Sequence, residues 1–246
     1  MWTELCYKET VQDRYAADIG DFGKLALVRA LALGQRLGIC WYMTNGFGEF
    51  NNDGRYLAYL QRPARFRQLD PECFDALASF VADFEAGRCP RSIESLEALA
   101  LLPSDSLFHN ELCPGLPAAR RDWVARMVKS MDRADLIFLD PDNGLEGATL
   151  SPKSTAIAEL VALRRSGRAL LLYHHQSRRA GGAVAEAAHV ARRLAEVGFA
   201  KIDAVRLRPY SSRFYFLLDA ETTLRGRLQE FAAQWGNLAQ IYPTGT

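Results

Sequence analysis

Apolar positions along the chain follow a helical period in some segments and form short runs in others. The helical spacing predicts helices over residues 21–36, 55–61, 71–87, 91–101, 117–132, 152–166 and 183–197. Short apolar runs predict strands over residues 39–43, 135–139, 168–173, 201–208 and 213–219. Asp21 is expected to cap the first helix, because it directly precedes the periodic apolar positions.

Strands that alternate with helices imply a mostly parallel sheet with helices packed on its faces. Residues 209–212 separate the last two strands and predict a C-terminal β-hairpin, with one antiparallel strand inserted at an edge. We therefore expect an α/β fold in which residues 1–246 form a single domain. The segment from about 61 to 132 is expected to be a mostly helical insertion, because only helices are predicted within it.

Composition narrows the class of protein. The 246 residues are 49% hydrophobic, and 30 Lys and Arg balance 29 Asp and Glu, which supports a large core and excludes a disordered or fibrous chain. No run of eighteen apolar residues occurs and no secretory signal is recognisable, so we expect a cytoplasmic protein without a membrane partner. The five cysteines form no CxxC pair, and no residue spacing indicates a metal site.

Three of the predicted strands end in segments rich in Asn, Asp, Gly or His. These segments contain Asn45, Gly46, Gly48, Asn52 and Asp53; Asp140, Asp142, Asn143 and Gly144; and His174, His175, Gln176 and Arg178. Any one of them can be an ordinary turn. Because ligands bind beyond the carboxyl ends of strands in open α/β sheets, three such segments at one sheet edge predict a site for proton transfer and base recognition.

Asp140 is the leading catalytic candidate, because it directly follows a wholly apolar strand and is expected at the sheet edge. With Asp142 in a different environment, one carboxylate can act as a base while the other orients a reacting group. An Asx-turn is the alternative role for Asp140. Side chains alternate along a strand, so only one of His174 and His175 should face the site, and we favour His174.

The cations of the chain indicate contact with phosphate. Arginine accounts for 25 of the 30 cations, and its planar guanidinium suits phosphates and bases. Lys24 follows a segment dense in Asp and Gly at the start of a helix, where an anion can bind, although a capped helix with an exposed lysine is the alternative. We therefore expect a nucleic acid partner, with solvated surface as the alternative role for these cations.

The motifs resemble those of bacterial large-subunit ribosomal-RNA adenine methyltransferases over the first seventy residues and from residue 135 onward. Residues 15–31 are similar to the aromatic turn and lysine-bearing helix before the first strand of that family. Residues 45–50 are similar to its cofactor loop, and residues 140–143 to its Asp-Pro-Pro-Tyr motif. The chain resembles more closely an uncharacterised bacterial family that shares the motifs DIGDFGK, NNDG and DPDNG. The resemblance implies a Rossmann-like, methyltransferase-type sheet.

The chain departs from the methyltransferase pattern at two positions. Tyr42 stands where sites for S-adenosylmethionine carry an acidic residue at the strand end, and Asn143 replaces the aromatic residue that stacks on the target base. An amide can bond to a base edge, but it cannot stack. No second strand with an acidic residue for the cofactor ribose is recognisable between residues 60 and 116. These departures predict that the fold is kept while methyl transfer is lost.

The favoured hypothesis is a hydrolase acting on nucleic acid, in its sharpest form a DNA glycosylase that removes a flipped, modified base without a cofactor. Its catalytic residues would be Asp140, Asp142 and His174. The residues expected to bind substrate are Lys24, Asn45, Asn52, Asp53, Asn143, Gln176 and Arg178. The alternative is an adenine-type methyltransferase that holds S-adenosylmethionine at Asn45, Gly46 and Gly48. A non-catalytic nucleic-acid-binding module is a third possibility.

Overall fold

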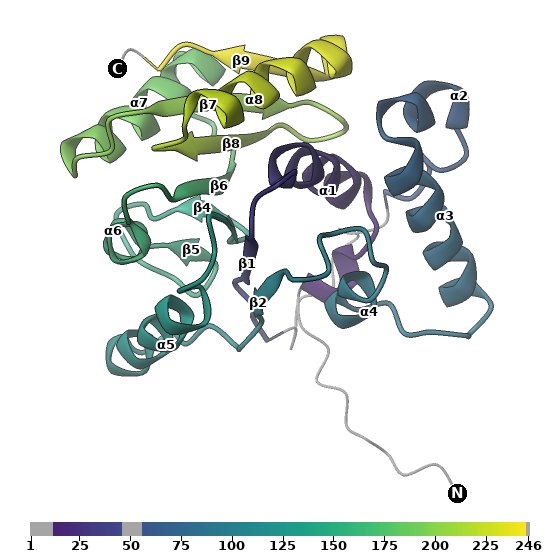
Figure 1. Cartoon of the computed structure of the whole chain (residues 1–246), viewed down its shortest axis with the longest axis horizontal. Helices are drawn as coiled ribbons and strands as arrows, with labels where there is room; N and C mark the ends of the chain where they lie inside the picture. Colours follow the sequence, from purple (N-terminus) through teal and green to yellow (C-terminus); the bar gives the residue numbers. More distant parts are fainter. Residues whose placement is uncertain (1–11, 46–55, 245–246) are drawn as a thin grey trace, which may run out of the picture.

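The computed structural model describes residues 12–45 and 56–244, and its centre is one seven-stranded sheet (Figure 1). The strand order is β2-β1-β3-β6-β8-β7-β9. These strands are β1 (Leu37–Trp41), β2 (Leu107–His109), β3 (Leu136–Asp140), β6 (Ala169–His175), β7 (Ile202–Leu207), β8 (Arg213–Leu218) and β9 (Ala239–Tyr242). A separate parallel pair is formed by β4 (Gly144–Leu145) and β5 (Ser154–Thr155).

Strand directions confirm the predicted mostly parallel, Rossmann-like α/β fold. The four strands β2, β1, β3 and β6 pair in parallel, and β8 is antiparallel to both β6 and β7. The C-terminal hairpin is therefore present, but its antiparallel strand lies inside the sheet rather than at an edge. The edge is formed by β9, which is antiparallel to β7 and was not predicted from the sequence.

Eight α-helices cover the sheet in the part of the chain that the structure describes. They are α1 (Ile19–Ala32), α2 (Pro63–Phe66), α3 (Pro71–Glu85), α4 (Ile93–Glu97), α5 (Pro117–Ser130), α6 (Ile157–Leu163), α7 (Gly182–Glu196) and α8 (Thr222–Trp235). Short 3-10 helices occur at Gln12–Tyr15, Arg67–Leu69 and Gly236–Leu238. No helix within this part is long and apolar enough to cross a membrane.

Alternation along the strands divides the core into two layers. In β3, Leu136 and Phe138 pack with residues of α1, α3, α4 and α8, while Ile137 and Leu139 pack with residues of α5, α6 and α7. Figure 1 shows these two groups of helices on opposite sides of the sheet. Because side chains two positions apart share a face, Asp140 at the end of β3 falls on the face covered by α1.

The start of α1 differs from the prediction. Asp18, not Asp21, is the N-cap, and its Oδ1 accepts hydrogen bonds from the backbone N–H groups of Gly20 and Asp21 at 2.6 and 3.0 Å. Asp21 instead accepts from the backbone N–H of Ala17 at 3.0 Å. Two carboxylates are therefore gathered at the N-terminus of α1, where the helix dipole favours negative charge.

The segment between β1 and α5 also corrects the prediction. The helix expected over 55–61 is absent from residues 56–61, which form turns, and the helix expected over 91–101 covers only Ile93–Glu97. Within the segment expected as a mostly helical insertion at 61–132, the three-residue strand β2 was not predicted, and it pairs in parallel with β1. The sheet therefore continues through this region.

We expect Gly144→Ala to destabilise the protein. Gly144 has a φ of +88°, and a Cβ there would lie 2.5 Å from Cα and Nδ1 of His174. The free energy of unfolding should fall by about 3 kcal/mol, through backbone strain and overpacking together. Urea denaturation measures this change. Gly147→Ala is the matched control, because nothing lies within 4 Å of its added methyl group, and an equal loss in both variants would contradict the account.

Candidate active site

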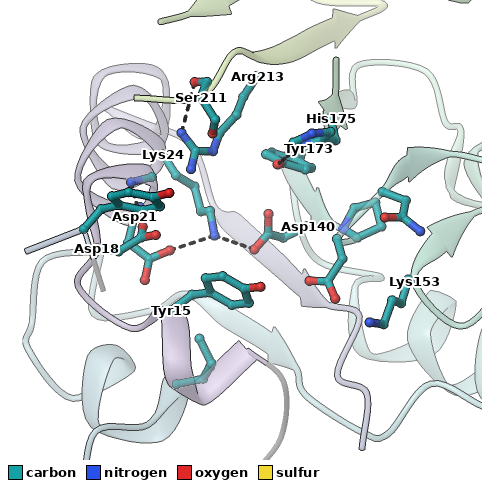
Figure 2. A pocket seen from close by; sticks show the side chains of 16 residues that line it. Tyr15, Asp18, Asp21, Lys24, Asp140, Lys153, Tyr173, His175, Ser211 and Arg213 are labelled. Carbon is teal, nitrogen blue, oxygen red and sulfur yellow. Dashed lines mark hydrogen bonds and ion pairs between the residues drawn. The ribbon is translucent and has the colours of Figure 1, made fainter. Parts of the chain in front are cut away.

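A polar cavity of about 390 Å³ opens at the carboxyl ends of β3 and β6, beside the N-terminus of α1. Its volume falls in the range of small-molecule sites. The polar side chains in its wall include Asp18, Asp21, Lys24, Asp140, Asp142, Asn143, Lys153, Tyr173, His175 and Arg213. Figure 2 shows these side chains around the cavity: Asp21 and Lys24 come from α1, Asp140 from β3, Tyr173 and His175 from β6, and Arg213 from β8. The cavity therefore lies at the edge of the sheet where the sequence predicts a site.

Lys24 lies at the centre of this cavity and links α1 to β3. Its ammonium Nζ donates to Asp21 Oδ1 at 2.8 Å and to Asp140 Oδ2 at 2.6 Å, as the dashed lines in Figure 2 show. The three side chains are 12%, 3% and 9% exposed, so water screens the two ion pairs only weakly. Nζ also lies 5.3 Å from the ring centroid of Trp41, within the range of a cation–π contact.

Burial and charge shift the pKa values of these groups. Burial raises the pKa of Asp140 from 3.8 to about 6 even though the nearby charge of Lys24 opposes the change. Burial and the negative charge of Asp21 raise the pKa of Asp18 to about 6 as well. For Lys24, burial disfavours the ammonium, but the carboxylates of Asp140 and Asp21 outweigh it and raise the pKa well above the ordinary value. Asp140 can therefore exchange a proton near neutral pH, while Lys24 stays charged.

The pairing of β6 with β8 determines which further side chains face the cavity. Tyr173 lies opposite Tyr215, and His175 lies opposite Arg213. Tyr173 and Tyr215 both pack in the core layer of α1, so the side chains at alternate positions of these strands point toward Lys24 and Asp140. Burial raises the pKa of the Tyr173 hydroxyl to about 12, and this hydroxyl lies 3.4 Å from Nδ1 of His175.

The preference for His174 is wrong, because His175 lines the cavity. His174 points to the opposite face of the sheet, where it is buried. Its Nδ1 accepts from the backbone N–H of Leu145 at 3.1 Å, and its Nε2 lies 3.0 Å from Oε1 of Glu186. Both ring nitrogens are therefore used in connecting β6 to β4 and α7, and His174 has a structural role.

The remaining predicted residues divide into three groups. Lys24, Asp140, Asp142 and Asn143 lie together in the cavity wall. Asn45, Gln176 and Arg178 are not part of that wall; Asn45 and Arg178 are exposed on the segments that follow β1 and β6. Gly46, Gly48, Asn52 and Asp53 lie outside the described residues.

Sequence reasoning missed Asp18, Tyr173 and His175 as site residues, and the structure adds Arg213 to the same wall. The guanidinium of Arg213 donates to the carbonyls of Pro209 and Ser211, both at 3.3 Å. It also lies against Gly20, where an added Cβ would be 2.8 Å from Nη2. Gly20, the first glycine of the DIGDFGK motif, thus leaves room for the side chain of Arg213. Strand parity relative to Asp140 is the signal that could have identified Tyr173 and His175.

No group of three or more His, Cys, Asp or Glu side chains in the described part of the chain is placed to hold a metal ion. In this cavity the ammonium of Lys24 lies between two of the four carboxylates instead.

The end of β1 bears on whether S-adenosylmethionine fits. After β1 the chain stays extended: Met43 forms a bridge with Leu112, and its carbonyl accepts from the N–H of Cys113 at 2.8 Å. The Tyr42 ring is buried against Trp123, with 5.2 Å between centroids, and its hydroxyl donates to Glu159 at 2.9 Å. The side chain of Tyr42 and the backbone of Met43 are therefore held by contacts within the chain.

The missing second strand exists as β2, so that part of the sequence argument is corrected. The two residues that follow β2 along the chain are Asn110 and Glu111, so an acidic residue stands just after the end of this strand. The Glu111 carboxylate pairs with Arg126 at 2.8 Å, and its carbonyl accepts from Trp123 Nε1 at 3.2 Å. Tyr42 is buried and the Glu111 carboxylate is already paired, so neither described residue offers an unengaged carboxylate to the cofactor ribose.

No protein-family model matches the chain, and no curated protein is similar to it. The chemistry of the cavity is therefore the basis for a functional assignment.

The shifted pKa of Asp140 predicts how stability depends on pH. Between pH 3.8 and about 6 the folded protein binds a proton that the unfolded chain releases, so this contribution to stability is lost as pH rises through 6. Relative to Asp140→Asn, wild-type protein should lose about 2 kcal/mol of unfolding free energy between about pH 4.5 and pH 7. Urea denaturation of both proteins measures the difference. A difference that does not change with pH would contradict the raised pKa.

Proposed function

We propose that the protein is a hydrolase acting on nucleic acid, most specifically a DNA glycosylase that removes a modified base flipped into the cavity. The observation that carries this proposal is the placement of Asp140, held by Lys24, at the floor of a polar cavity at the carboxyl ends of the parallel strands. A flipped base needs a pocket that supplies both hydrogen bonds and a charged group next to its sugar. The cavity wall provides both kinds of group.

Asp140 is the group that acts on water in this proposal. With a pKa of about 6, its carboxylate is mostly ionised at pH 7 and can still accept a proton. It would accept a proton from the water that attacks C1′ of the sugar, and its negative charge would stabilise the cationic sugar that forms as the base departs. Asp142, in the same wall, would share the electrostatic role.

Lys24 positions Asp140 rather than attacking the sugar itself. Because two carboxylates hold its ammonium in the charged form, it has no free electron pair with which to form a Schiff base. The proposed reaction is therefore simple hydrolysis by water.

Recognition and release of the base would depend on the groups around Asp140. The amide of Asn143 can donate to and accept from a base edge. The role predicted for His174 passes to Tyr173 and His175, which lie in the wall. The Tyr173 hydroxyl, with a pKa of about 12, stays protonated and can donate a hydrogen bond to the departing base.

A second candidate is a methyltransferase acting on a nucleic-acid amine, with Asp140 and Asn143 at the target. The strand order favours it, because β8 is inserted between β6 and β7 as in the methyltransferase-type sheet expected from the resemblance. The buried Tyr42 and the paired Glu111 weigh against it, because neither offers an unengaged carboxylate to the cofactor ribose. We therefore place it second.

Asp140→Asn should abolish base release while the protein stays folded. The substitution keeps the volume of the side chain and removes the charge and the proton acceptor, so we expect a loss of at least about 100-fold in rate. Mass spectrometry of bases released from a panel of DNA duplexes with modified bases measures this. Asp83→Asn is the control. Asp83 is a surface carboxylate on α3 that pairs with Arg88, so this variant should keep wild-type activity. Full activity in a folded Asp140→Asn protein would rule out the assignment.

Binding to single-stranded DNA should weaken steeply as salt concentration rises, because cations on the protein replace counterions on phosphate. Arg178, exposed on the segment that follows β6, should contribute one such contact. Arg178→Ala is expected to lower the slope of log affinity against log salt by about 1, measured by fluorescence anisotropy. Arg88→Ala, on the remote α3 side, is the control and should leave the slope unchanged. A slope near zero for the wild-type protein would contradict the predicted nucleic acid partner.

A further inference from the structure

Two exposed tyrosines from distant parts of the chain have their rings in contact, tilted against each other, beside the cavity. The ring centroids of Tyr56 and Tyr210 are 5.3 Å apart, with an angle of 34° between the ring planes. The residues are 44% and 51% exposed, so much of each ring faces solvent. Tyr56 belongs to the cavity wall, and Tyr210 directly precedes Ser211 of the same wall. The pair is therefore an open aromatic surface next to the polar site.

Both tyrosines are anchored to the elements that carry the catalytic groups. The carbonyl of Tyr56 accepts from the N–H of Ile19, the first residue of α1, at 3.2 Å. Tyr210 lies in the β7–β8 turn, where the guanidinium of Arg213 holds the carbonyls of Pro209 and Ser211. In Figure 2, Ser211 and Arg213 lie on the same side of the cavity as Lys24. The backbone at both tyrosines is thus tied to α1 and to the strand that carries Arg213.

The backbone at Tyr210 is strained. Its φ is +61°, in the left-handed region that a bulky side chain rarely adopts and that Gly or Asn would occupy more easily. A tyrosine at this turn position therefore costs stability. Strain of this kind is characteristic of residues kept for contacts with a ligand.

We propose that Tyr56 and Tyr210 form the stacking platform for the planar base that the cavity receives. Asn143 cannot stack, and the two tyrosines supply exposed aromatic rings at the same cavity. Stacking on aromatic rings accepts any base with a π-face, so the pair would give affinity for the ring while Asn143 reads its edge. This inference rests on the proposed function, because it takes a nucleobase as the ligand.

The test uses 2-aminopurine deoxyriboside as the probe, because its fluorescence is quenched when it stacks on an aromatic ring. Tyr56→Ala and Tyr210→Ala should each weaken its binding by about 5- to 100-fold. Tyr56→Phe and Tyr210→Phe keep the ring and should stay within about threefold of wild type. Phe84→Ala removes an exposed ring from α3, away from the cavity, and should have no effect. Absence of quenching by the wild-type protein, or equal affinity in the Ala variants, would overturn the proposal.

Tyr210→Gly separates recognition from folding. It removes the ring and relieves the positive φ, so binding should fall as in Tyr210→Ala while the thermal midpoint is at least as high as that of Tyr210→Ala. A lower midpoint in Tyr210→Gly than in Tyr210→Ala would show that the backbone strain has been misassigned and would count against a ring kept for binding.

The two proposals can fail independently. Quenching that depends on both rings, without release of any base from DNA, would reject the glycosylase and retain the platform. If base release occurs and its KM is the same in wild type, Tyr56→Ala and Tyr210→Ala, the glycosylase is retained and the platform is rejected.

Discussion

The ammonium of Lys24, held between Asp21 and Asp140, is the interaction on which the rest of the site depends. It joins the first turns of α1 to the end of β3, elements separated by more than a hundred residues, and it does so where little water can screen the charges. Removing one partner of a buried ion pair leaves an uncompensated charge that typically costs about 3–5 kcal/mol. The pairing therefore fixes the distance between helix and sheet, and it leaves the second oxygen of Asp140 available for chemistry in the cavity.

The edge of the sheet at the carboxyl ends of the parallel strands has two structurally different parts. At β3, β6 and β8 the alternation of side chains brings Asp140, Tyr173, His175 and Arg213 to the face of α1, and a polar cavity remains open there. At β1 and β2 the chain continues in an extended form and buries Tyr42 against Trp123. The open acid–base site at β3, β6 and β8 supports the proposed hydrolysis on a Rossmann-like sheet.

Much of the sheet could be predicted from the sequence, because its strands are apolar runs bounded by glycine or polar residues, and Asp140 and Lys24 are conspicuous at their boundaries. Other features depend on contacts between distant segments. The three residues of β2 form a strand only through pairing with β1, and β9 only through pairing with β7. His174 and His175 are equivalent in the sequence, and the face that each occupies follows from the register of β6 against its neighbours. Backbone geometry likewise makes Asp18 rather than Asp21 the N-cap. The Asp21 carboxylate instead accepts a hydrogen bond from the ammonium of Lys24.

Calorimetric titration of the purified protein with S-adenosylmethionine and S-adenosylhomocysteine tests the central claim most directly, namely that the cavity works without a methyl donor. Because Tyr42 is buried and Glu111 is paired with Arg126, we expect no binding of either compound at micromolar concentrations. Micromolar affinity for both would contradict this account and would make the cavity the amine-binding half of a methyltransferase.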